Sequence, residues 1–500
     1  MPGAAAPPHA FRQPPARAMA AMVLVLLLAG CAQTGPRHGD AGPATVAPAV
    51  ALGVDDRFGA DAGAPRPSPA DLRWWHRFDD AAMASWVERA LAANPAVAIA
   101  GEQTAQARAL LRSARAQRGV QLGAQADATL RLQRDAGERR LQPGAGLTLD
   151  FDTDLWGGLR QAEQSAAAGL LRSQDLLQAE RLSTAGLAAR AYLEWRVAAQ
   201  DAALLADVLQ LQREVLRVAT IRVEAGLAPV LDRDRATAEM AATEAEQAAA
   251  AVRVRQSLAA LQVLAGESPL PPAHTPGGPQ GTTAGALSDI PALQGLQPVA
   301  RPLDLLRLRP DLRAAEQALV GAAADVGVAE AALRPRLRLP GRLVFGAATG
   351  GGLLELVTAT LAAALDVTLF DGGARQADVD AARSRARSAA QVYRQTLLQA
   401  LQQVESALAA QQGATVRVAA RERAADAARA AEMQAQSLYR AGLAGSLEWI
   451  DAQRTALANR RALLQAGADA AAASVLAFEA MGLIDDAQDA AIRNPRRDTP

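Results

Sequence analysis

The side chains that could bind a metal ion or act as a catalytic base are few and scattered. The four histidines are His9, His38, His76 and His274, and no two of them share a predicted helix at the spacing of metal ligands. The acidic run "DFDTD" (150–154) could attract a cation, but strand geometry would spread its carboxylates along one polar face. The chain has neither a nucleotide-binding P-loop nor a GxSxG elbow. We therefore expect no enzymatic activity, no bound metal ion and no cofactor.

The single cysteine, Cys31, has a context that predicts lipid attachment. It follows the apolar run 18–30, which is too short to span a bilayer and is typical of a secretory signal. The run ends in "LAGC" (28–31), which resembles the lipobox of bacterial lipoproteins, where the cysteine is acylated after cleavage. Ala32, rather than aspartate, comes next, which in lipoprotein sorting implies the outer membrane. The alternative is an ordinary signal with an incidental cysteine.

The composition favours an elongated helical protein over a thick globular core. Aromatic residues make up 3% of the chain and charged residues 21%, and alanine predominates among the apolar residues, which suits close helix contacts. Lys plus Arg and Asp plus Glu are equal at 52 each. Because nucleic-acid binding requires a basic surplus or stripe, we expect no nucleic-acid partner.

The two halves of the chain repeat each other at a nearly constant offset of 215 or 216 residues. The aligned segments are 94–116 with 309–331, Gly157-Gly158 with Gly372-Gly373, and 223–236 with 439–452. Such a steady offset indicates a tandem duplication. The duplication explains why the chain contains the same strand-to-helix hinge twice.

Each half is predicted to contain a helix, two strands of alternating apolar and polar residues, a long helix and a return helix. The long helices lack proline and would each extend roughly 100 Å at 1.5 Å per residue. Glycine turns at Gly226 and Gly442 end them. The predicted strands are 120–133, 147–155, 337–345 and 360–370; the predicted long and return helices are 158–225, 230–264, 373–441 and 446–480.

Segments rich in proline and glycine precede the first repeat and separate the two repeats, and their composition predicts flexible connections. They define the boundaries of the predicted domains. The division is a signal peptide (1–30), an acylated tether (31–70), a first repeat (71–266), an equatorial connector (267–303), a second repeat (304–483) and a C-terminal tail (484–500).

The four predicted strands cannot form a stable sheet in a bilayer by themselves. Their lengths and alternation suit membrane strands, but open sheet edges would leave backbone groups unpaired in hydrocarbon. Membrane barrels start at about eight strands. If the strands lie in a membrane, several copies must join and their polar faces must line a pore. A soluble sheet beside an ordinary coiled coil is the alternative.

Several segments resemble the signature segments of the TolC-like outer-membrane efflux lipoproteins, and the resemblance covers the chain from about Trp74 to Leu483. It implies a mainly α fold with membrane β-strands: a homotrimer in which twelve strands close one barrel and long antiparallel helical hairpins form an α-barrel. It also implies two partners, a periplasmic adaptor and an inner-membrane pump, usually of the proton-driven resistance-nodulation-division type. The segments are "DLWGGLRQA" (154–162), "LRPDLRAAE" (308–316), "LFDGGARQADVDAAR" (369–383), "YRQTLLQALQQVESALAA" (393–410) and "YRAGLAGSLEWIDAQR" (439–454).

The resemblance also implies a gate at the end of the second helical hairpin. In the family, a leucine and an aspartate four residues apart form the constriction, and Leu447 and Asp451 match them. This spacing puts both on one helix face, so a trimer would carry a leucine ring that blocks the bore and a carboxylate ring that attracts cations. Alternatively, Leu447 packs between helices and Asp451 is solvated or ion-paired. Leu231 and Arg235 are the first-repeat counterparts and possible latch residues, whereas Trp449 is expected to pack.

The function that the resemblance implies is passive, gated export of drugs or other small molecules from the periplasm to the outside. Two alternatives stay open within the class of pores, an exit duct for secreted proteins and one for metal ions. A lipid-anchored periplasmic scaffold without a pore is the alternative outside that class.

Overall fold

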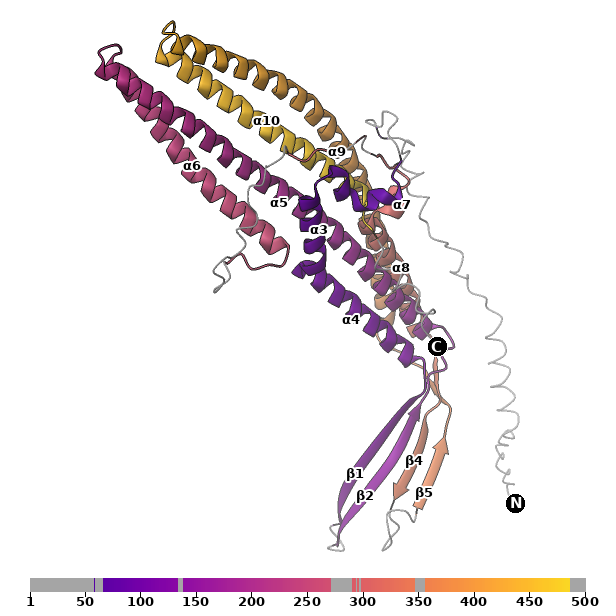
Figure 1. The fold of residues 1–500 in the computed structure, drawn as a ribbon. Helices are drawn as coiled ribbons and strands as arrows, with labels where there is room; N and C mark the ends of the chain where they lie inside the picture. Colours follow the sequence, from indigo (N-terminus) through magenta and orange to yellow (C-terminus); the bar gives the residue numbers. More distant parts are fainter. Residues whose placement is uncertain are drawn as a thin grey trace, which may run out of the picture. The chain divides into compact units, whose positions relative to one another are not determined.

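The structure is a computed structural model that describes residues 58, 66–133, 138–270, 290–293, 295, 298–346 and 356–485. Helices make up most of this part of the chain, and a small group of strands lies at one end of them (Figure 1). Across the described ranges, we find no helix with the length and apolar character needed to cross a membrane. The elements are η2 (Pro69–Phe78), α3 (Ala81–Ala93), α4 (Pro95–Gln117), β1 (Gln121–Gln133), β2 (Glu138–Asp150), α5 (Gly158–Glu224), α6 (Val230–Leu264), α7 (Leu305–Leu308), α8 (Pro310–Ala332), β3 (Arg336–Arg338), β4 (Gly341–Gly346), β5 (Leu356–Leu361), β6 (Ala364–Asp366), α9 (Ala374–Arg440) and α10 (Ser446–Met481).

The two long helices, α5 and α9, have 67 residues each. Each begins after a glycine in the left-handed conformation and is capped by an aspartate: Asp154 accepts from the backbone of Leu159 and Arg160, and Asp371 accepts from that of Arg375. A carboxylate at this end is stabilised by the otherwise unpaired backbone N–H groups. Neither helix contains a proline that would interrupt it.

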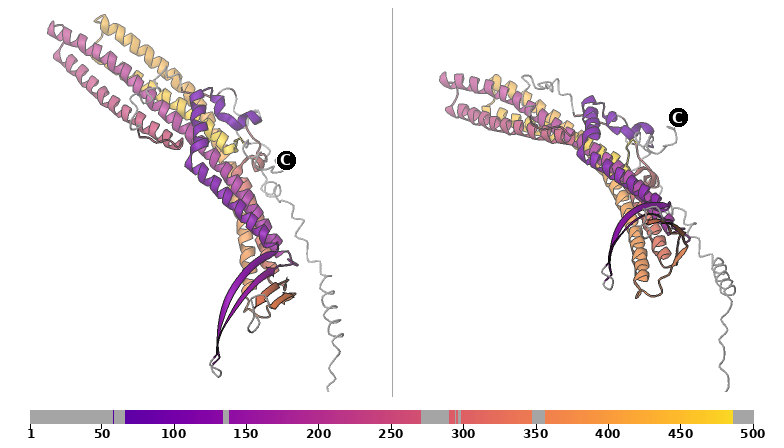
Figure 2. Two further views of the ribbon diagram at one scale, coloured as in Figure 1. Left: turned by 60° about the horizontal axis from the view of Figure 1, so that its bottom comes forward. Right: turned by 90° about the horizontal axis from the view of Figure 1, so that it is seen from below.

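Each long helix forms an antiparallel hairpin with its return helix, α5 with α6 and α9 with α10. The two hairpins lie side by side in Figure 1 and in both views of Figure 2, and α10 packs directly on α5. Small residues dominate the buried positions of the return helices, for example Ala250 of α6 and Ala456 of α10. Close approach of the helices therefore depends on alanine.

Four strands, two from each repeat, form one antiparallel sheet in the order β1-β2-β4-β5. The register puts Leu122, Leu149 and Leu361 in one row across the sheet, and Thr148, Arg342 and Thr360 in the next row. Because neighbouring rows point to opposite faces, one face is apolar and the other polar. Leu122 is 78% exposed and Leu361 79%, so none of the described residues covers these leucines of the apolar face.

The predicted boundaries of three strands were wrong. The strand predicted at 147–155 is β2, Glu138–Asp150: its pairing with β1 includes Pro143 and Gly144, residues typical of a loop. The strand predicted at 337–345 is divided into β3 and β4 around Pro340, which has no N–H to donate to a ladder. The strand predicted at 360–370 is likewise divided into β5 and β6, and β6 pairs with β3 in a separate two-stranded sheet.

Aromatic side chains hold the N-terminal segment against the helices. Trp74 of η2 is fully buried and stacks on Phe478 of α10, with ring centroids 5.6 Å apart. Asp80 caps α3 and also accepts from the Tyr192 hydroxyl of α5 at 2.9 Å. Burial, with the nearby Asp80 charge, raises the pKa of Tyr192 to about 12. Tyr192 is therefore a proton donor to Asp80 at any physiological pH.

Candidate gate at the helical hairpin tips

Both hairpin tips are closed by the same kind of glycine turn. Gly226 and Gly442 have φ angles of +70° and +71°, a conformation that costs glycine little and other residues much more. In each turn the next residue donates back to the last helical turn: Leu227 N–H to Arg222 at 2.8 Å, and Leu443 N–H to Leu438 at 2.9 Å. This is the Schellman arrangement of a helix C-terminus. The predicted tip glycines thus reverse the chain in the same way in both repeats.

Leu447 and Asp451 lie together on one exposed face of the first two turns of α10. The Leu447 side chain is 54% exposed, so it does not pack between helices of its own chain. Asp451 is also exposed, and no hydrogen bond or ion pair reaches it from the described residues. Its negative charge contributes to the raised pKa of the neighbouring Arg454. Both side chains are therefore accessible at the surface that the described residues form.

Leu231 and Arg235 occupy the corresponding exposed face of α6. Leu231 is 53% exposed. Arg235 is also exposed, and within the described part of the chain it makes no ion pair and no hydrogen bond to a carboxylate. A latch through Arg235 would thus need a carboxylate from another copy.

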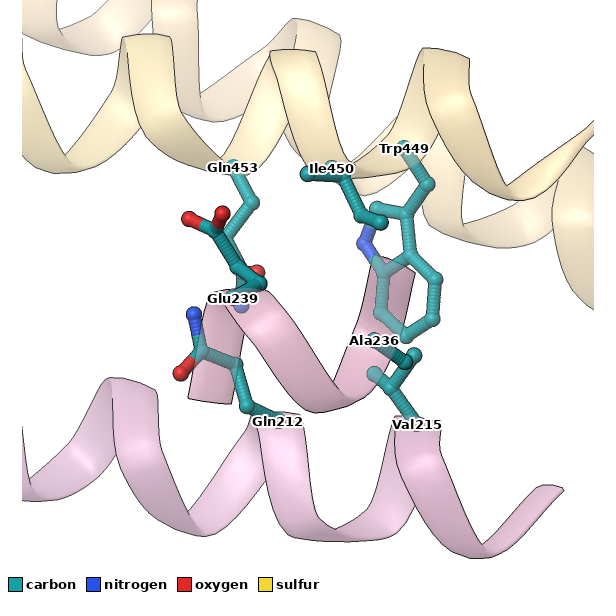
Figure 3. A pocket seen from close by; sticks show the side chains of 7 residues that line it. All are labelled: Gln212, Val215, Ala236, Glu239, Trp449, Ile450 and Gln453. Carbon is teal, nitrogen blue, oxygen red and sulfur yellow. The ribbon is translucent and has the colours of Figure 1, made fainter. Parts of the chain in front are cut away.

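The opposite face of α10 is buried. Trp449 and Gln453 lie two positions after Leu447 and Asp451, and this spacing places them on that opposite face. Trp449 is 5% exposed and packs on Tyr439, with ring centroids 5.0 Å apart. It also belongs to a buried cluster with residues of α5 and α6 (Figure 3). The prediction that Trp449 packs is confirmed. Trp449 therefore holds the start of α10 against the other hairpin.

Polar cross-links between α10 and the first hairpin run along this contact, and sequence reasoning missed them. They are Ser446 with Asp232, Arg454 with Glu239, and Arg461 with Glu246 and Asp201. The two acceptors of α6, Glu239 and Glu246, are seven residues apart, and the two arginines have the same spacing. Equal heptad spacing on both return helices is the signal that could have revealed them.

The cross-links also raise the pKa of both arginines. The hydrogen bond that Arg454 donates to Glu239, together with the charge of Glu239, raises the pKa of Arg454. Burial alone would lower the pKa of Arg461, but hydrogen bonds to Asp201 and Glu246 at 2.5 and 2.7 Å outweigh it and raise this pKa. Both arginines therefore stay charged, and the cross-links do not depend on pH near neutrality.

The other predicted site residues lie far from the tips or outside the described residues. At the strand-to-helix hinges, Gly157, Gly372 and Gly373 have positive φ angles, whereas Gly158 is the first residue of α5. Cys31 lies outside the described residues. In the described ranges, no three His, Cys, Asp or Glu side chains are arranged to hold a metal ion.

Comparison with known proteins gives a consistent assignment. The family described as "Outer membrane efflux protein" matches residues 86–267 and 302–482. The outer membrane protein OprJ of Pseudomonas aeruginosa is 28% identical over 94% of this chain and 96% of its own length. The pyoverdine export outer membrane protein OpmQ of Pseudomonas putida is 29% identical over 69% of this chain and 73% of its own length.

A solved structure agrees with the assignment in fold as well. The outer-membrane channel OprN superposes with a TM-score of 0.75 at 28% identity, over 86% of this chain and 96% of that one. OprN is described as an outer-membrane channel, and OpmQ as an outer membrane protein of pyoverdine export. The match covers both repeats and the strands between their helices. The chain therefore belongs to the outer membrane efflux protein family and is an efflux channel of the outer membrane.

Proposed function

We propose that three copies of the chain assemble into one conduit that exports small molecules passively from the periplasm. The observation that carries the proposal is the one-sided sheet. Its apolar face is exposed, and its outer strands β1 and β5 each have a single neighbour. Joining β5 of one copy to β1 of the next would satisfy both edges, and three copies would close twelve strands around the polar face.

The helical hairpins would continue the conduit into the periplasm. Their exposed faces carry many Arg, Asp, Glu and Gln side chains, which are compatible with water and not with hydrocarbon. Acylation of Cys31, followed by the tether at 31–70, would add a lipid anchor to the strands. A periplasmic adaptor and an inner-membrane pump would complete the system, and the pump would select the cargo.

The gate of this conduit would be the pair Leu447 and Asp451. Both side chains are exposed on one face of α10, and the opposite face is fixed to the first hairpin by Trp449. Threefold symmetry would gather three leucines and three carboxylates near one axis, where the leucines exclude water and the carboxylates favour cations. Leu231 and Arg235 would latch the closed state by contacting a neighbouring copy.

The proposal is tested by single-channel recording of the purified full chain in planar bilayers. The double variant Leu447→Ala, Asp451→Ala should pass more current than the wild type because it removes both rings. Asp451→Asn alone should reduce the preference for cations with a smaller change in conductance. Thr237→Ala, at an exposed position of α6, serves as the control and should match the wild type.

Two results would contradict different parts of the proposal. A wild-type conductance for the double variant would show that the gate lies elsewhere. A single subunit that passes no ions, even after the tips are loosened, would exclude the conduit itself. Trimer mass on a detergent gel separates these cases.

A further inference from the structure

A small cavity lies between α5, α6 and α10, directly behind the proposed gate residues. Its volume is about 10 Å³, the space that one water molecule requires. Figure 3 shows polar side chains gathered at one end of it and apolar side chains at the other. The lining residues are Gln212, Val215, Ala236, Glu239, Trp449, Ile450 and Gln453.

Among the described residues, three polar atoms around this cavity find no hydrogen-bond partner. They are the Gln212 carbonyl oxygen Oε1, the Gln453 amide nitrogen Nε2 and the Trp449 indole nitrogen Nε1. All three side chains are nearly fully buried, at 4%, 5% and 5% exposure. A buried polar group without a partner is strongly destabilising, so three of them around one cavity indicate a bound species that satisfies them.

The chemistry of the lining selects water as that species. Gln453 and Trp449 offer two N–H donors, Gln212 offers an acceptor, and the Glu239 carboxylate supplies a second acceptor although it already binds Arg454. A cation would face two N–H donors, and an anion would face the Glu239 charge. Water can accept two hydrogen bonds and donate two.

We propose that one ordered water molecule binds in this cavity and joins α10 to both helices of the first hairpin. Gln453 and Trp449 are then positioning residues for the gate, because they lie on the face of α10 opposite Leu447 and Asp451. The water site stands on its own geometry, whereas its effect on conductance rests on the proposed gate.

The test uses the full-length protein and two variants, Gln453→Leu and Gln212→Leu. Each single change removes one of the water's partners and leaves the opposite glutamine buried and unpaired, so the backbone amides of 450–456 should exchange with solvent about tenfold faster. The double variant replaces both glutamines with apolar groups, so neither glutamine is left unpaired, and it should return part of the protection. Wild-type density from cryo-electron microscopy should show one peak between Gln212 Oε1 and Gln453 Nε2.

Thr237→Leu is the matched control, because Thr237 is the exposed counterpart of Gln453 in the first repeat. It should change neither exchange nor current. The single Gln variants should also raise the open fraction in planar bilayers severalfold, which a purely structural role would not require. An empty cavity in well-resolved density would overturn the water site. It would also be overturned if the double variant lost as much exchange protection as the two single Gln variants together. Faster exchange with unchanged current would overturn the positioning role only.

Discussion

The two helical hairpins share one turn geometry but differ in how their return helices begin. The glycine turns have nearly identical φ angles. Beyond them, the second repeat has Trp449 and Gln453 buried against the first hairpin, whereas the counterparts at an offset of 216, Arg233 and Thr237, lie at the surface. The two tips thus share the turn and differ in the residues that dock the return helix.

This difference assigns distinct roles to the two hairpins. The first hairpin supplies the surface that receives α10, through Val215 and Ala219 of α5 and Ala236 of α6. The second hairpin carries the exposed pair Leu447 and Asp451 on the far side of the docked helix. Breaking the docking contact should therefore release the second tip and leave the first unchanged.

Replacement of Trp449 by alanine should have the largest effect. Loss of a buried indole costs about 3–5 kcal/mol in stability of the local contact, because Tyr439 and the α5 and α6 side chains would line an empty space. We expect rapid proteolysis and rapid hydrogen exchange at the second tip. Arg233, the counterpart at the first tip, forms an ion pair with the adjacent Asp234, so Arg233→Ala should change stability by less than about 0.5 kcal/mol. Equal effects at both tips would refute the asymmetry.

Replacement of the turn glycine by alanine should destabilise the two tips by the same amount. Gly226→Ala and Gly442→Ala each force an alanine into the left-handed region, at a cost of about 1–2 kcal/mol. No neighbouring atom lies within 4 Å of the added Cβ in either turn, so backbone strain is the only cost. Local unfolding free energies from hydrogen exchange at the two tips measure it. A difference of more than about 1 kcal/mol between the two variants would show that the turns are not equivalent.

The sequence predicts the long helices well and the strands less well, for a physical reason. Helices α5 and α9 are determined by local features: no proline, an aspartate cap and a glycine turn at the end. The strands depend on partners far away in the chain. The segment at Pro143 pairs with β1 although it looks like a loop, and Pro340 divides a strand whose alternation looks continuous.

The same distinction applies to the site. Leu447 and Asp451 follow from a local match to the family, and the structure adds only that both are exposed. The partners of Glu239 and Gln453 come from another helix, so their roles could not be deduced from local sequence alone. Contacts between copies in the proposed trimer likewise join residues that are not close in the sequence, so local sequence does not predict them.

Removal of an exposed cross-link should have a smaller effect than either change above. Arg454→Ala breaks the ion pair with Glu239, but the Arg454 side chain is 65% exposed. An ion pair in that setting contributes about 0.2–1 kcal/mol and weakens as salt is added. Exchange rates near the second tip should rise less than tenfold, and the difference from the wild type should shrink at high salt. A loss that exceeds the loss in Trp449→Ala would show that charge, and not packing, docks α10.

The smallest effect should come from a half-buried carboxylate of the second hairpin whose counterpart in the first hairpin is apolar. Glu432 of α9 is half-buried, and its counterpart at an offset of 216 is Leu216 of α5. Burial raises the pKa of Glu432 above 4.5, although Arg460 and Arg429 oppose the shift. The folded hairpin therefore holds the Glu432 proton more tightly than the unfolded chain does, and its stability should fall as pH rises through the raised pKa.

Hydrogen exchange measured at pH 5 and pH 7, corrected for intrinsic rates, should show this slope in α9. Glu432→Gln should flatten it because the amide does not titrate, whereas Glu422→Gln, at an exposed position of the same helix, should leave it unchanged. If the wild type and Glu432→Gln have the same slope, Glu432 does not make the second hairpin sensitive to pH. In that case the asymmetry between the hairpins would rest on the packing of α10 alone.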